Sequence, residues 1–252
     1  MNAPLTGFWL SDASVPLAEI LASLDFDFVV LDIEHGVFDL AILERFIPVL
    51  KGLGLEVWAK TLAPRQDSIQ QPLDFGADGV IIPHVDSFER AERVTAHAKY
   101  APVGDRSLAG GRAYAYEGWS RQQTDAYNAQ IMCYPLIEHP GAVRDIEKIA
   151  ALPTVDGFQI GTSDLALTSG RDSYSQSEED WNDIERCVAA FNNAGKPWLF
   201  PAWTESEQKW ALENGARRLM IGVQYHWIKS ALRQAKEQFD LLPIQDRLLS
   251  RN

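Results

Sequence analysis

The stretch "FVVLDIEHGVFD", Phe28 to Asp39, decides the fold, because a run of apolar β-formers changes abruptly into charged residues. Such a run is typical of a strand that is buried on both faces, as in a parallel sheet. Asp32, Glu34 and His35 end the run, and Gly36 follows them. Ionisable groups at the tip of a buried strand are costly unless they are paired or used. The stretch therefore predicts a parallel α/β sheet with polar chemistry at its strand ends.

The same pattern recurs along the whole chain. Short apolar runs alternate with segments of helical period, and Ser14, Asp39 and Ser87 are placed to cap the starts of helices. Eight strand–helix units of about 30 residues each predict an α/β fold of the (β/α)8 TIM-barrel type. The expected strands are Thr6–Leu10, Phe26–Glu34, Glu56–Leu62, Gly79–Val85, Ile131–Glu138, Gly157–Gly161, Trp198–Trp203 and Arg218–Val223.

Composition narrows the class of protein. The 252 residues are 46% hydrophobic, which suits one domain over residues 1–252. A net charge of −12 argues against nucleic acid or an anionic membrane surface as a partner. No apolar run approaches the roughly 20 residues that a membrane span needs, and the first ten residues do not resemble a signal peptide. Cys133 and Cys187 lack paired spacing, so we expect free thiols and a cytoplasmic location.

Two segments depart from the strand–helix rhythm. Residues 102–130 form a long Gly- and Tyr-rich stretch, which we expect to be a loop that acts as a lid or subunit contact. The C-terminal helix and tail, residues 225–252, are expected to make subunit contacts as well.

Barrel enzymes carry their active sites at the carboxyl ends of the strands. Ionisable residues cluster at the expected carboxyl ends of the strands, whereas no such cluster occurs at the expected amino ends. This asymmetry predicts catalysis. The residues are Asp32, Glu34, His35, Lys60, His84, Glu138, His139 and Asp164.

Glu138 and Asp164 fall at the tips of neighbouring strands. Two carboxylates about 4 Å apart repel by about 4 kcal/mol at an effective dielectric constant near 20, and a hard divalent cation removes that repulsion. Alternatively, each acid caps the helix that follows it. The start of the helix at Ser163 and Asp164 also offers free amides to an anion such as a carboxylate.

Asp32 and Glu34 are two residues apart, so in a strand their side chains share a face. His35, beside an acid and ahead of a glycine, is suited to move a proton near neutral pH. The alternatives are a salt bridge at the strand end and a structural histidine.

Taken together, "VLDIEHG", "LIE" and "GTSDLA" form a specific combination in this order, and further similarity runs from about Gly7 to Phe239. The chain thereby resembles the HpcH/HpaI aldolase family, the metal-dependent class II pyruvate aldolases. The resemblance implies a TIM barrel of the phosphoenolpyruvate/pyruvate-binding type. It also implies a homo-oligomer, commonly a hexamer built as a trimer of dimers that exchange their last helix.

The resemblance implies roles for the strand-end residues. Glu138 and Asp164 match the ligands of a divalent metal ion (Mg²⁺, Mn²⁺ or Co²⁺) that chelates a 2-oxo acid and stabilises its enolate. His35, oriented by Asp32, matches the group that moves a proton on the aldehyde side. The substrate carboxylate is expected at the amides of Ser163 and Asp164. Supporting roles fall to Glu34, which holds the loop, and to Asp74, near a subunit boundary.

Two positions depart from the family pattern. Lys60 stands where an arginine usually contacts the keto oxygen, and Leu136 stands where a glutamine is usual. Because one ammonium replaces a planar fork of donors, Arg to Lys is not conservative here. We expect Lys60 to replace the arginine electrostatically, with a Schiff-base role as the alternative.

The expected function is a lyase that reversibly cleaves a 4-hydroxy-2-oxo acid to pyruvate, or a close analogue, and an aldehyde. One alternative keeps the metal and changes the acceptor, as in citrate-synthesising or acyl-CoA lyase proteins. Such an acceptor would require a nucleotide-sized groove and basic residues, for which Arg106 and Arg112 are the only local candidates. The other is a barrel that binds a ligand without turnover.

Overall fold

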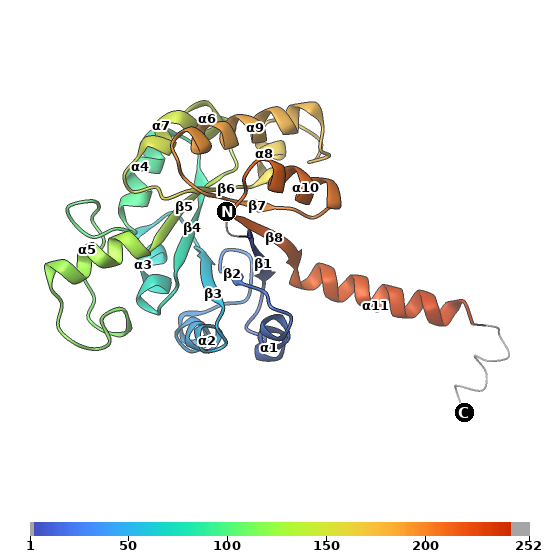
Figure 1. Cartoon of the computed structure of the whole chain (residues 1–252), viewed down its shortest axis with the longest axis horizontal. Coiled ribbons are helices and arrows are strands. Elements are labelled where there is room, and N and C mark those ends of the chain that lie inside the picture. The colour runs from blue at the N-terminus through green and yellow to red at the C-terminus, as the bar shows by residue number, and fades with distance from the viewer. Residues whose placement is uncertain (1–2, 243–252) are drawn as a thin grey trace.

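The computed structural model describes residues 3–242 and shows a closed barrel of eight parallel strands in which the first and last strands pair (Figure 1). Helices alternate with the strands and, apart from the last helix, cover the outside of the barrel. The expected TIM barrel is therefore confirmed. The strands are β1 Leu5–Leu10, β2 Phe28–Asp32, β3 Glu56–Lys60, β4 Gly79–Val85, β5 Met132–Ile137, β6 Phe158–Ile160, β7 Trp198–Pro201 and β8 Arg218–Val223.

Helix starts and ends follow the sequence signals. The side chains of Ser14, Asp39 and Ser87 each accept a backbone N–H of the first helical turn, as expected. Gly76 and Gly215 each follow the end of a helix, α3 and α10, and have φ of 105° and 88°, a conformation that favours glycine. The α-helices are α1 Val15–Ser23, α2 Leu40–Gly52, α3 Gln66–Asp74, α4 Phe88–Ala96, α5 Arg121–Gln130, α6 Pro140–Arg144, α7 Ile146–Ala151, α8 Thr162–Thr168, α9 Glu178–Asn193, α10 Glu205–Glu213 and α11 Gln224–Asp240.

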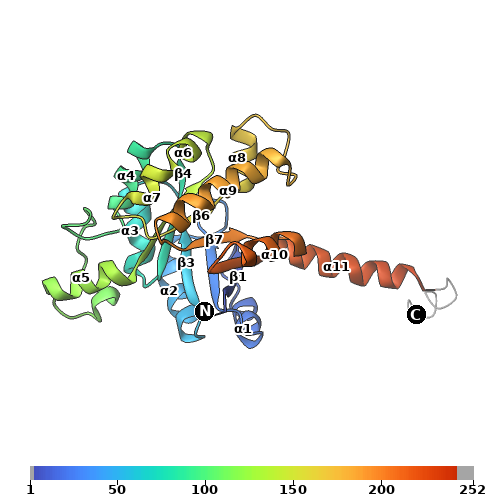
Figure 2. The ribbon, with the colours of Figure 1, turned by 45° about the horizontal axis from the view of Figure 1, so that its top comes forward.

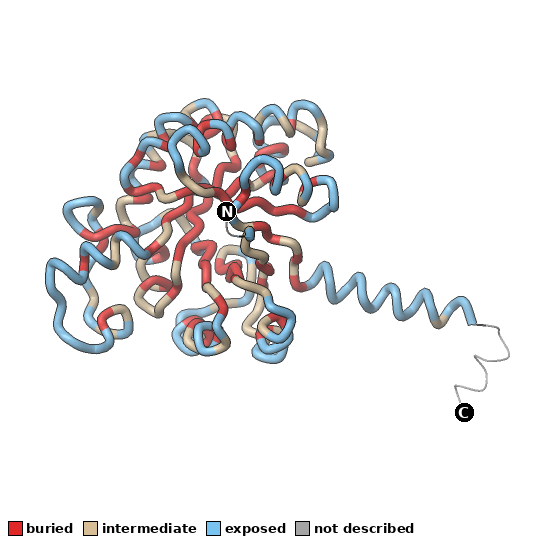
Figure 3. The backbone as a smooth tube through the Cα atoms, viewed as in Figure 1, coloured by how far each residue is buried: buried red, intermediate tan, exposed pale blue. Residues whose placement is uncertain are grey.

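Two layers of buried side chains hold the barrel together. Residues that alternate along the strands fill the barrel interior, and their neighbours pack against the surrounding helices. Buried residues accordingly concentrate along the strands in Figure 3, while the outer surfaces of the helices are exposed. The interior residues are Phe28, Val30, Trp58, Ile81, Tyr134, Leu136, Leu199 and Met220.

The segment 102–130 is not the continuous loop that we expected. It contains a 3₁₀ turn at Arg112–Tyr114 and the helix α5, which Ser120 caps. Arg106 fixes the segment to the barrel, because its guanidinium lies between the rings of Tyr100 and Tyr127 and pairs with Asp74 at 2.5 Å. Asp74 therefore anchors this segment.

Helix α11 leaves the barrel and extends away from it in both views (Figures 1 and 2). Of its residues, only Gln224 is buried, and large apolar side chains such as Ile228 and Leu232 are exposed. Residues 243–252 of the expected tail lie outside the described residues. Over residues 3–242, no helix combines the length and the apolar character that crossing a membrane requires.

Candidate active site

Lys60 forms the centre of a buried charge network at the carboxyl ends of β2 and β3. The register pairs Asp32 with Lys60, so their side chains emerge side by side. The Lys60 Nζ lies 2.6 Å from Glu34 Oε2 and 3.7 Å from Asp32 Oδ1, and only 5% of the lysine is exposed. A buried ammonium needs such partners, because desolvation of an unpaired charge is costly.

Asp32 holds the backbone of the turn, whereas the imidazole of His35 lies against Glu34. Asp32 accepts hydrogen bonds from the Trp9 indole at 3.0 Å and from the His35 backbone N–H at 3.2 Å. The strand ends at Asp32 and Gly36 N bonds back to Asp32 O, which turns the His35 ring outward. Within the described residues, the expected contact between the Asp32 carboxylate and the His35 imidazole is therefore not formed.

Glu34 is the carboxylate that both histidines approach. Its Oε1 lies 2.6 Å from His84 Nε2, and its Oε2 lies 3.5 Å from His35 Nε2 as well as against Lys60. Both imidazoles are well exposed, with 66% of the His35 side chain and 60% of the His84 side chain accessible. Glu34 thus links the lysine to two groups that can move protons, which is more than the loop-holding role that we expected.

His84 reaches this position through an unusual backbone. Its φ of 59° is in the left-handed region, which residues other than glycine seldom adopt. This conformation directs its N–H at Glu138 Oε1, at 2.5 Å, and brings its Nδ1 within 3.6 Å of the same oxygen. The pairing between β4 and β5 shifts register at this point. Strained backbone of this kind gathers at functional sites.

Glu138 follows β5 and is 6% exposed. Burial raises the pKa of its carboxyl, and the nearby negative charge of Asp164 acts in the same direction. The hydrogen bond from His84 and the charge of Lys60 oppose that rise in pKa. Gly161 leaves the room that this carboxyl occupies, because a Cβ there would lie 3.2 Å from Glu138 Oε2.

Asp164 lies in the first turn of α8 and is exposed. Across residues 3–242, no group of three or more histidine, cysteine, aspartate or glutamate side chains is placed to hold a metal ion. Glu138 and Asp164 nevertheless repel each other electrostatically, and two carboxylates are the donor type that Mg²⁺ and similar ions prefer. These two carboxylates would therefore suit a divalent cation.

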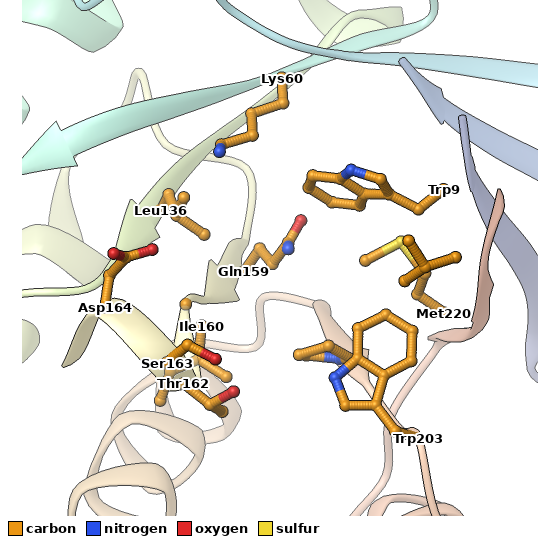
Figure 4. Close-up of a pocket in the computed structure, with 13 residues that line it drawn as sticks. Trp9, Lys60, Leu136, Gln159, Ile160, Thr162, Ser163, Asp164, Trp203 and Met220 are labelled. Carbon is orange, nitrogen blue, oxygen red and sulfur yellow. The ribbon is translucent and has the colours of Figure 1, made fainter. Parts of the chain in front are cut away.

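Two cavities open beside this acidic pair, and Asp164 lines both. The first, of about 170 Å³, is shown in Figure 4 and contains Lys60, Leu136, Gln159 and Ser163. The second, of about 450 Å³, is lined by the carboxylates of Glu34 and Glu138 and by three histidines, His35, His84 and His139. The expected site residues therefore gather at one end of the barrel, except Asp74.

Trp9, Gln159 and Trp203 are among the residues of the first cavity that sequence reasoning missed. Each lies on or just after a barrel strand near its carboxyl end. Trp9 and Gln159 sit in apolar runs whose inward-facing positions the sequence alone did not distinguish. Leu136 lines this cavity as expected, and β-sheet pairing places it directly beside Gln159.

Comparison with known proteins identifies the family of the chain. Residues 5–224 match the family described as HpcH/HpaI aldolase/citrate lyase. The chain belongs to this family. Because the HpcH/HpaI relatives are aldolases, the protein is an enzyme of the carbon–carbon lyase class.

Individual relatives span most of the chain. A 4-hydroxy-2-oxovalerate aldolase of Novosphingobium aromaticivorans is 32% identical over 86% of this chain and 83% of its own. A hydroxypyruvate/pyruvate aldolase of Paraburkholderia phytofirmans is 28% identical over 93% of both chains. The crystal structure of an HpcH/HpaI aldolase from Desulfitobacterium hafniense superimposes with a TM-score of 0.89 at 24% identity, covering 96% of this chain and 94% of that one, which supports the shared fold.

Proposed function

We propose that this protein is a metal-dependent aldolase that reversibly cleaves a 4-hydroxy-2-oxo acid to pyruvate, or a close analogue, and an aldehyde. One observation carries the proposal: the acidic pair Glu138 and Asp164 adjoins both a cavity that holds Lys60 and a cavity that holds His35 and His84. Cleavage needs electron withdrawal from the oxo acid and proton removal from the 4-hydroxyl, and the two cavities offer groups for each.

Glu138 and Asp164 are the residues that would hold a divalent cation such as Mg²⁺, Mn²⁺ or Co²⁺. When bound, such an ion supplies Lewis acidity to a 2-oxo acid. Ser163 and Asp164 line the same cavity as Lys60, which suits the binding of the substrate carboxylate beside the keto oxygen.

Lys60 would stabilise negative charge on the keto oxygen as the C3–C4 bond breaks and its electron pair moves toward C2. Its Nζ is paired with the carboxylates of Glu34 and Asp32, and an imine at this nitrogen would disturb both pairs. The electrostatic role is therefore preferred to the Schiff base. Borohydride treatment in the presence of pyruvate should leave Lys60 unmodified, as peptide mass mapping would show.

His35 would take the proton from the 4-hydroxyl, directly or through water. Asp32 would assist by fixing the His35 backbone, and Glu34 would face the imidazole. This division differs from an Asp32–His35 pair, but it keeps all three residues in the reaction. The His35 ring is exposed to the second cavity, where an aldehyde has room.

Metal removal tests the proposal. Protein treated with EDTA should not cleave 4-hydroxy-2-oxo acids, and Mg²⁺, Mn²⁺ or Co²⁺ should restore cleavage. Glu138→Gln and Asp164→Asn should each lower the restored kcat roughly 100-fold or more, the scale of losing one charge-stabilising group. Glu147→Gln, which removes an exposed carboxylate from α7, is the matched control. Cleavage that survives EDTA, or that no metal restores across a panel of aldehyde products, would contradict the proposal.

A changed acceptor is the second candidate, because the family description also includes citrate lyase. An acyl-CoA acceptor would need basic residues free to bind its phosphates. Arg106 is buried against Asp74, and Arg112 lies 3.5 Å from Glu44. Both expected arginines are thus paired in the structure, which favours an aldehyde over a nucleotide-bearing acceptor.

We also propose a homo-oligomer, with a hexamer built as a trimer of dimers as the specific expectation, and a cytoplasmic location. The exposed apolar side chains of α11 support subunit contacts through this helix. Cys133 and Cys187 are free, as expected, and both are buried; free thiols are usual in a reducing compartment.

A further inference from the structure

The buried ion pair of Lys60 and Glu34 links the two cavities of the active site. Lys60 lines the first cavity and Glu34 lines the second, and the Lys60 Nζ lies 2.6 Å from Glu34 Oε2. Only 6% of the lysine side chain and 9% of the glutamate side chain are exposed. The pair therefore connects the cavity proposed for the oxo acid with the cavity proposed for the aldehyde.

Glu34 Oε2 is also the oxygen that His35 faces. The His35 Nε2 lies 3.5 Å from this oxygen, and the imidazole lines the second cavity. The other carboxylate oxygen, Oε1, lies 2.6 Å from His84 Nε2, which holds the glutamate in place. One carboxylate oxygen is thus within reach of both an imidazole and a buried ammonium, and such a contact suits the transfer of a proton between them.

The Lys60 ammonium keeps a donor for the first cavity. An ammonium has three N–H donors, and the pairs with Glu34 and Asp32 use at most two of them. Figure 4 shows the Lys60 Nζ pointing into this cavity, where the proposed function places the keto oxygen of the oxo acid. Since C3 is bonded to the carbon that carries the keto oxygen, a donor at this oxygen is also close to C3.

Aldol cleavage moves one proton from oxygen to carbon. The 4-hydroxyl loses a proton, the C3–C4 bond breaks, and its electron pair passes through C2 to the keto oxygen. The enolate that results becomes pyruvate only when C3 gains a proton. Each turnover therefore delivers a proton to the second cavity and consumes a proton in the first.

We propose that the proton which His35 removes from the 4-hydroxyl returns to C3 through Glu34 and Lys60. Lys60 donates a proton to C3, and Glu34 then passes a proton from His35 to the lysine amine. Each group ends the turnover in the protonation state in which it began, so the balance needs no other donor. This inference rests on the proposed function and gives Lys60 a second role, that of the catalytic acid at C3.

Two variants interrupt the relay while the site keeps its shape. Lys60→Arg keeps the positive charge but supplies no proton, because arginine is not deprotonated in proteins. Glu34→Gln keeps the length of the side chain but replaces the carboxylate that carries the proton. In both variants the C3–C4 bond can still break, whereas the enolate must wait for a proton from solvent.

Rapid mixing with 4-hydroxy-2-oxopentanoate tests the relay, because aldehyde and pyruvate form in different steps. The protein is first loaded with whichever of Mg²⁺, Mn²⁺ and Co²⁺ restores cleavage. The wild-type protein should release both products together. Each variant should give a burst of about one aldehyde per active site, followed by turnover that is about tenfold or more slower than in the wild-type protein.

Exchange of the C3 hydrogens of pyruvate with D₂O, followed by NMR, is a second measurement that needs no aldehyde. The reverse relay removes a proton from C3, so both variants should exchange about tenfold or more slowly. Lys51→Arg and Glu147→Gln make the same substitutions at positions that line neither cavity. These controls should show no burst and should exchange as the wild-type protein does.

The possible outcomes separate this inference from the proposed function. Aldehyde and pyruvate that slow in parallel without a burst place Lys60 and Glu34 before bond cleavage, and unchanged kinetics make water the proton donor. Either result overturns the relay and leaves the aldolase proposal standing. If the Tm shows that Glu34→Gln does not fold, Lys60→Arg decides alone. Absence of metal-dependent cleavage by the wild-type protein overturns both.

Discussion

At the scale of single residues, Lys60 contributes both to the stability of the fold and to the proposed reaction, because its buried ammonium pairs with two carboxylates. Lys60→Met would leave Asp32 and Glu34 without their cation, and breaking a buried pair in this way costs roughly 3–5 kcal/mol. We expect a lower Tm together with a kcat that falls roughly 100-fold or more. Lys60→Arg should retain more of both.

Lys99 supplies the matched control for this prediction. It is equally buried and pairs with Asp156 at 2.8 Å, but it lines neither cavity of the active site. Lys99→Met should therefore lower Tm to a similar extent while kcat of the folded protein is retained. Equal losses of kcat in the two variants would show that Lys60 acts only through stability.

The burial of Glu138 predicts that the stability of the metal-free protein depends on pH. Since burial raises its pKa in the folded protein, the folded state disfavours the carboxylate more than the unfolded state does. The resulting destabilisation of the metal-free protein is present above the raised pKa and vanishes below the unfolded value of 4.5. Metal-free Glu138→Gln should melt at a higher temperature than the wild-type protein at pH 8, and the difference should disappear near pH 4. A lower Tm for the variant at pH 8 would contradict this account, as measured by calorimetry.

At the scale of elements, the strands were predictable because their signal is local. Phe28–Asp32 and Arg218–Val223 are apolar runs with polar ends, and eight such runs leave little choice of fold. Helix α5 was not predictable, because Tyr127 is the only large apolar side chain in Arg121–Gln130 and the segment carries no apolar stripe. Tertiary contacts, chiefly Arg106 between two tyrosine rings, hold that segment against the barrel instead.

In the site, too, the features that depend on local sequence were predictable, whereas those that depend on tertiary contacts were not. Strand ends identified the ionisable residues, but the partner of each depends on turn geometry that the sequence does not encode locally. The family resemblance implied that Asp32 orients His35, whereas the chain leaves the sheet at Asp32 and brings Glu34 to both imidazoles. The position of Gln159 in the cavity wall was not predictable for a related reason, because only the closed barrel shows which face of β6 lines a cavity.

At the scale of the whole molecule, α11 is the feature that a single chain does not explain. The helix extends from the barrel with Ile228 and Leu232, one turn apart on one face, 46% and 66% exposed (Figure 1). Exposed apolar stripes of this kind mark interaction sites. We expect the protein to sediment as an oligomer, with a mass six times 28.2 kDa for a hexamer. Replacing both residues by glutamate should shift the mass toward that of the single chain.

The control must introduce two glutamates as well, without touching the stripe. Lys229→Glu with Arg233→Glu alters the neighbouring surface of α11 and should leave the oligomer intact, because neither residue carries the apolar contact area. Sedimentation at several protein concentrations measures both variants. If the glutamates at 228 and 232 leave the mass unchanged, α11 is not the contact, and its exposed face serves another purpose. If dissociation also abolishes aldol cleavage while Tm is retained, a neighbouring subunit completes the active site.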